Sequence, residues 1–85
     1  MKILYNKEDN EYYLITNNKD KFYIYNDAYI VTNSLSDLLN LIKNIDLENC
    51  ELYEDDIAPD ETIIFETNSK KELLNLSNTH PELFI

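Results

Sequence analysis

The side chains most able to do chemistry in this 85-residue chain are carboxylates, and they gather in one stretch. Nine acidic residues fall between Lys43 and Lys70, where no basic residue occurs. Carboxylates can act as general acids and bases, ligate calcium, or bind the cationic side chains of a protein partner. The densest part predicts an acidic loop at residues 55–60. The acidic residues expected to contact a partner are Glu51, Glu54, Asp55, Asp56, Asp60 and Glu61.

Catalysis and metal binding are both disfavoured by the rest of the sequence. A catalytic carboxylate pair needs a cleft that separates its two pKa values, and a chain this short leaves little room for one. Calcium at Asp55, Asp56, Asp60 and Glu61 would lack the spacing and the glycine of an EF-hand loop, since the chain contains no glycine. Zinc lacks its usual ligands. We therefore expect no enzyme activity, no cofactor and no metal site.

The single histidine and the single cysteine have simpler explanations than catalysis. His80 precedes Pro81 in a predicted surface tail, without a partner that would hold it as a general base. Cys50 has no cationic neighbour in sequence to lower its pKa, so we expect a buried thiol in a strand. One cysteine allows no internal disulfide, which is typical of the cytoplasm.

The net charge of −10 limits the classes of partner. Direct nucleic-acid binding needs basic groups that neutralise phosphates, and anionic membranes would repel the chain. The same charge would steer the chain towards a basic surface. Solubility alone also explains an acid excess, so that alternative stays open.

The elements that must position these residues follow from hydrophobic patterning and turn residues. Apolar runs separated by polar turns predict strands over residues 2–5, 11–16, 21–25, 28–32, 49–54 and 61–66. Without glycine, turn positions of positive φ must fall to Asn and Asp, as in the predicted two-residue turn Asn26-Asp27.

Two helices are predicted from a repeated segment. Residues 32–41 and 67–76 are identical at seven of ten positions, and each follows an apolar run. Ser34 and Ser69 occupy N-cap positions, with Asp37 and Glu72 three residues later, as in a capping box. The first helix has an apolar face up to residue 45, and the second must end near residue 78, before Pro81. The repeat indicates either an internal duplication of 28–45 and 61–78 or convergence on one helix-start pattern.

Together these elements predict one α+β domain over residues 1–85. It has a mostly antiparallel sheet of five to six strands, in the order strand-strand-strand-strand-helix-strand-strand-helix, with two helices packed on one face. Pairing the strands through their shortest turns sorts the side chains into two faces. The face expected to receive the helices carries Leu4, Tyr13, Ile15, Phe22, Ile24, Tyr29 and Val31. The face expected to stay open carries Ile3, Tyr5, Tyr12, Leu14, Tyr23, Tyr25, Ala28 and Ile30.

Two hypotheses of function follow. The first is a small acidic inhibitor that binds a basic, nucleic-acid-handling protein as a nucleic-acid mimic, with Tyr23 and Tyr25 as anchors beside the carboxylates. A viral anti-CRISPR or other anti-defence protein, an immunity protein or an antitoxin would fit this description. The alternative is a structural or adaptor module that self-associates, for example as a homodimer, through its tyrosine-rich sheet face.

Overall fold

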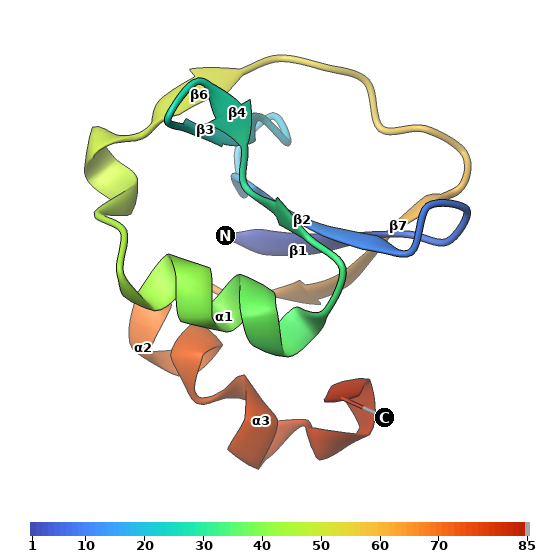
Figure 1. Cartoon of the computed structure of the whole chain (residues 1–85), viewed down its shortest axis with the longest axis vertical. Helices are drawn as coiled ribbons and strands as arrows, with labels where there is room; N and C mark the ends of the chain where they lie inside the picture. The colour runs from blue at the N-terminus through green and yellow to red at the C-terminus, as the bar shows by residue number, and fades with distance from the viewer. Residues whose placement is uncertain (85) are drawn as a thin grey trace.

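The alternating pattern of the N-terminal third folds into antiparallel strands, and the two repeated segments fold into helices. We describe the protein from a computed structural model, which defines residues 1–84. The result is an α+β fold with a seven-stranded antiparallel sheet and helices on one side of it (Figure 1). The strands are β1 (Lys2–Asn6), β2 (Glu11–Ile15), β3 (Phe22–Tyr25), β4 (Ala28–Tyr29), β5 (Val31–Thr32), β6 (Glu51–Tyr53) and β7 (Glu61–Glu66). The helices are α1 (Leu35–Lys43), α2 (Lys70–Leu74) and α3 (Leu76–Thr79), with 3-10 turns at Leu47–Asn49 and Pro81–Phe84.

The turns confirm that Asn and Asp replace glycine at most positions of positive φ. Asn10, Asp20, Asn26 and Asp27 all have φ between 49° and 62°. Short polar side chains tolerate this left-handed region better than other residues do. Lys19, with φ of 66°, is the exception, and it has no such local compensation.

The predicted fourth strand, residues 28–32, is divided into two strands at Ile30. β2 and β3 pair only at Ile15 and Phe22 and then diverge. β4 pairs with β3, while β5 pairs with β2, so this segment fills the wedge between them. At the junction the N–H of Ile30 donates to the Tyr23 carbonyl (3.2 Å), and the Ile30 carbonyl accepts from the N–H of Leu14 (3.4 Å).

The two strands that flank the acidic loop lie at opposite edges of the sheet. β6 pairs only with β3, and β7 pairs only with β1. The connection from residue 54 to residue 60 must therefore pass β3, β2 and β1, a distance of about 19 Å at the usual strand spacing. Seven extended residues span about 25 Å at most, so this loop can cross the sheet and still form the turn at residues 58–61. Figure 1 shows it along the edge of the molecule farthest from the helices.

The helices cover the face that was expected to stay open, and the predicted assignment of the two faces is wrong in this respect. The main core joins Ile3, Leu14 and Ile30 of the sheet to α1, α2 and α3, and all three side chains are at most 2% exposed. The predicted division of the strand side chains into two faces is confirmed, because Leu4, Ile15 and Phe22 form a separate cluster on the other face. We call that other face, opposite the helices, the far face.

A physical reason for the reversal lies in the side chains themselves. The helix-covered face contributes compact aliphatic residues, which form one buried cluster with the leucines of the helices. The far face carries aromatic residues that shield one another and are partly covered by the acidic loop through Ile57. A tyrosine-rich face is therefore not a reliable sign of a face without helices, because tyrosine rings pack equally well on either face of this sheet.

Both serine caps are confirmed, and the second helical segment ends at Thr79, close to the predicted end near residue 78. The hydroxyl of Ser34 accepts from the N–H of Asp37 (3.1 Å), and that of Ser69 accepts from the N–H of Glu72 (3.2 Å). At Asn75 the second helix breaks into α2 and α3. Within residues 1–84, no helix is long and apolar enough to cross a membrane.

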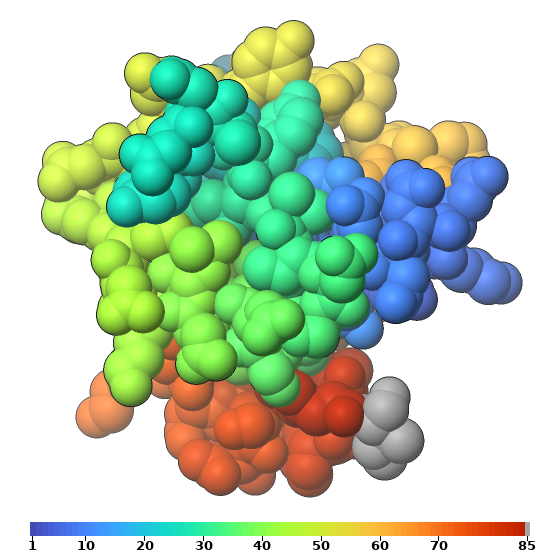
Figure 2. All heavy atoms as spheres, viewed as in Figure 1, coloured from blue at the N-terminus to red at the C-terminus, as the bar shows by residue number. Residues whose placement is uncertain are grey.

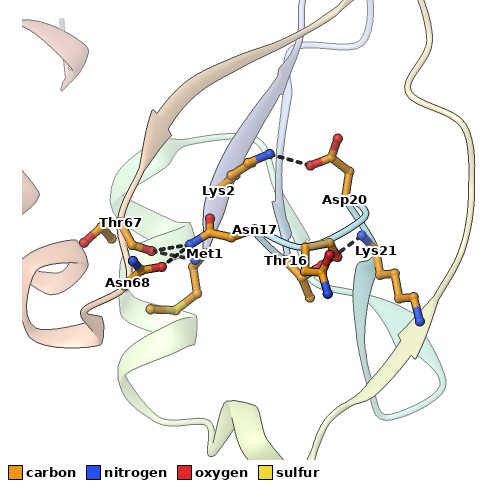
Figure 3. Close-up of polar contacts among 9 residues, drawn as sticks. Met1, Lys2, Thr16, Asn17, Asp20, Lys21, Thr67 and Asn68 are labelled. Atoms are coloured by element: carbon orange, nitrogen blue, oxygen red, sulfur yellow. Dashed lines mark hydrogen bonds and ion pairs between the residues drawn. The ribbon is translucent and has the colours of Figure 1, made fainter.

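Polar contacts fasten the start of the chain to the end of β7 (Figure 3). The Met1 amine donates to the Thr67 carbonyl (2.6 Å), and the Asn17 amide donates to the same carbonyl (3.3 Å) and to Asn68. Burial lowers the pKa of the Met1 amine. These contacts hold the β7–α2 junction against the turn between β2 and β3, and so fix one end of the sheet.

Candidate functional site

β6 is the least covered strand, and its register decides which of its side chains face the acidic loop. Glu51 lies opposite Ile24 and Tyr53 opposite Phe22, so both side chains belong to the far face. Leu52 lies opposite Tyr23 and points to the other side. Tyr53 is 53% exposed and Leu52 is 49% exposed, which is unusual for side chains of this size.

The predicted acidic residues divide into two groups. Glu51, Glu54, Asp55 and Asp56 are all exposed and continuous along β6 and the start of the loop. We call these four residues the acidic margin. Figure 2 shows the segment that contains them, in yellow, at the margin of the surface opposite α2 and α3. Asp60 and Glu61 lie four and five residues beyond Asp56, where the loop ends and β7 begins.

The second group has a structural role within the loop. A Glu61 carboxylate oxygen accepts from the N–H of Ala58 (2.7 Å), and the Glu61 N–H donates to the Ala58 carbonyl (3.0 Å). The Asp60 carbonyl accepts from the N–H of Lys7 (3.1 Å). Both side chains are half-buried. They therefore fix the end of the loop and present less free charge than the acidic margin does.

Nearby lysines neutralise only a small part of the acidic margin. Lys21 Nζ lies 3.6 Å from a Glu54 carboxylate oxygen, in a pair whose glutamate side chain is 73% exposed. Lys19 borders the surface hollow formed by Glu54, Asp55 and Asp56. Exposed ion pairs of this kind contribute about 0–1 kcal/mol and are screened by salt. Among the six predicted acidic residues, Glu54 is the only one with an ion pair in the part of the chain that the structure defines.

The two tyrosines predicted as anchors belong to the opposite face of the sheet from Glu51 and Tyr53. Tyr23 packs against the main core on the helix-covered face, and burial raises its pKa. It borders a cavity of about 440 Å³ together with Met1, Leu47 and Lys70. Tyr25 is 41% exposed, beside the turn between β3 and β4. Of the predicted anchors, only Tyr25 offers a substantial exposed surface.

Sequence reasoning missed the aromatic residues that do accompany the acidic margin. Tyr13, Phe22, Tyr29 and Tyr53 form a connected group on the far face, which we call the aromatic cluster. Neighbouring ring centroids lie between 5.2 and 6.1 Å apart, mostly edge to face. Strand parity had already placed Tyr13, Phe22 and Tyr29 on one face, but Tyr53 joins them only through the pairing of β6 with β3, which no local pattern in the sequence predicts.

Carboxylates contact the aromatic cluster at two of its tyrosines. The Tyr29 hydroxyl donates to an Asp55 carboxylate oxygen (3.3 Å), and the Tyr13 hydroxyl donates to one of Glu11 (3.3 Å). Burial and the Glu11 carboxylate raise the pKa of Tyr13 to about 12, with a further contribution from Glu61. Burial and Asp55 also raise the pKa of Tyr29. The far face is thus an aromatic surface bordered by negative charge.

The single cysteine and the single histidine lie in separate packing environments. Cys50 was expected to be a buried thiol within a strand, but it lies just before β6 and is half-buried. Burial raises the pKa of this thiol, which disfavours the thiolate. His80 packs edge to face on Phe65, with ring centroids 5.2 Å apart. Leu83 and Phe84 pack against the main core, while residue 85 lies outside the described range. In residues 1–84 no group of three or more His, Cys, Asp or Glu side chains is placed to hold a metal ion.

Comparison with models of protein families, with curated proteins and with solved structures finds no significant match to this chain. Its function must therefore be inferred from the geometry of the acidic margin and the aromatic cluster.

Proposed function

We propose that this protein is a small non-enzymatic inhibitor that binds a basic, nucleic-acid-handling protein through the acidic margin and the adjoining aromatic cluster. The observation that carries the proposal is the continuity of four exposed carboxylates beside the exposed ring of Tyr53. Protein interfaces combine such an aromatic anchor with charges that fix orientation.

The charge of the surface favours a partner that normally holds DNA or RNA. Nucleic-acid-binding proteins carry clustered lysine and arginine, which match a row of carboxylates as they match a row of phosphates. A chain with net charge −10 would be drawn to such a surface and would compete with the nucleic acid for it. Anti-defence proteins of viruses, immunity proteins and antitoxins are the functional classes that work in this way.

The alternative, self-association through the tyrosine-rich face, has less support because the helices cover that face. Tyr12 and Tyr23 of that face pack against the helix-covered core. A symmetric dimer through the far face would instead bring two acidic margins together, and the repulsion would oppose it. Light scattering over a range of concentrations tests this directly.

Affinity capture from a bacterial lysate tests the proposal. The immobilised chain should retain nucleic-acid-binding proteins at low salt and release them at high salt, and added DNA or RNA should compete. The double substitution Asp55→Lys, Asp56→Lys should abolish this retention. The matched control is Glu8→Lys, Glu82→Lys, which makes the same change in charge at exposed positions outside the acidic margin. Equal retention by both variants would contradict the proposal.

A further inference from the structure

A hollow on the far face adjoins the acidic margin and is not explained by packing. It has a volume of about 350 Å³ and is lined by Ile24, Asp27, Ala28, Tyr29, Glu51 and Tyr53. This volume is at the low end of the range for ligand sites, so it suits a single side chain better than a large ligand. Its walls are two tyrosine rings, with centroids 6.1 Å apart and planes 67° from parallel.

The polar groups of the hollow are negative and unpaired. The carboxylates of Asp27 and Glu51 are exposed, and neither takes part in an ion pair or a side-chain hydrogen bond within residues 1–84. Asp55 does not line the hollow, but its carboxylate accepts from the hydroxyl of Tyr29, which does. Aromatic faces and carboxylates together attract a flat cation, and a guanidinium group fits both better than an ammonium group does.

We infer that this hollow receives an arginine side chain of the partner. The inference depends on the proposed function for the existence of a basic protein partner, and it names the group of that partner which is recognised. The guanidinium plane lies against the exposed ring of Tyr53 and its N–H groups donate to Glu51 and Asp27. Charge complementarity selects this occupant over a second copy of the chain, whose surface carries the same negative charge.

The test uses two peptides, acetylated octa-arginine amide and acetylated octa-lysine amide, titrated into the ¹⁵N-labelled protein at low salt. Octa-arginine should shift the amide signals of Ala28, Tyr29 and Tyr53 and should bind more tightly than octa-lysine. Tyr53→Leu should weaken octa-arginine binding by about two- to fivefold, the amount expected for an exposed cation–π contact, while Tyr53→Phe keeps the affinity. Glu51→Gln should weaken binding more than Glu82→Gln, a control of equal charge in the helical layer.

Each other outcome overturns the inference. Equal binding of the two peptides would mean that charge alone is recognised, and unchanged binding by Tyr53→Leu and Glu51→Gln would place the contact elsewhere. The two proposals can fail separately. If a basic partner is captured but octa-arginine does not shift the amide signals around the hollow, only the inferred arginine site is wrong. If octa-arginine binds in the hollow but no nucleic-acid-handling protein is captured, the proposed function is wrong.

Discussion

The acidic loop packs on the sheet through one apolar side chain, that of Ile57, in addition to its hydrogen bonds, and truncating this side chain tests how much the packing contributes. Ile57 packs on the far face against the cluster of Leu4, Ile15 and Phe22. Ile57→Ala removes three carbon atoms, which at about 0.8 kcal/mol for each buried carbon would cost ~2.4 kcal/mol if the side chain were fully buried. Because Ile57 is half-buried, we expect a loss of about 1–2 kcal/mol in the free energy of unfolding.

Urea unfolding and thermal melting measure this loss, and each kcal/mol should lower the melting temperature by about 4–8 °C in a domain of this size. Ile57→Val removes one carbon atom and should cost about a third as much. Hydrogen exchange at residues 55–58 should accelerate in Ile57→Ala, while exchange in α1 changes only with global stability. If Ile57→Ala has the stability of the wild type, or if the alanine and valine variants are equal, the loop is not held by packing on the far face.

Three further predictions concern the caps, a strained turn and a tyrosine. Ser34→Ala and Ser69→Ala should each lower the free energy of unfolding by about 1 kcal/mol, measured in urea, because each removes a capping bond; no loss in either would contradict the cap. Lys19→Gly should raise stability by about 0.5–1 kcal/mol because glycine relieves the left-handed φ of 66°, while Lys19→Ala, with the same loss of charge, should bring no gain. In an alkaline absorbance titration one tyrosine should ionise near pH 12, and Tyr13→Phe should remove that step. Because the pKa of Tyr13 is higher in the folded state than in the unfolded state, the neutral Tyr13 hydroxyl contributes to stability below pH 10, and this contribution is lost as the pH approaches 12.

Much of the fold could be predicted from local patterns in the sequence. The caps at Ser34 and Ser69 and the turn at Asn26-Asp27 depend on nearest neighbours, and the structure confirms them. The division of the sheet into two faces followed from strand parity alone. These features are local, so no knowledge of the rest of the chain was needed.

The errors arose where distant segments compete for the same surface. The break at Ile30 depends on the divergence of β2 from β3, which no local pattern records. Which face the helices cover depends on how well whole layers pack. Aliphatic residues such as Ile3 and Leu14 pack with the leucines of the helices, so the helices cover the face that carries them. Tyr53 was overlooked because its importance comes from its contact with Tyr29, 24 residues away in sequence.

The most direct measurement of the central claim is a competition experiment with a captured partner and its labelled DNA or RNA. Increasing amounts of the chain should displace the nucleic acid at low salt, and displacement should weaken steeply as salt is added. The Asp55→Lys, Asp56→Lys variant should displace none. A stable complex containing the partner, the nucleic acid and this chain together would contradict the claim that its carboxylates occupy a nucleic-acid site.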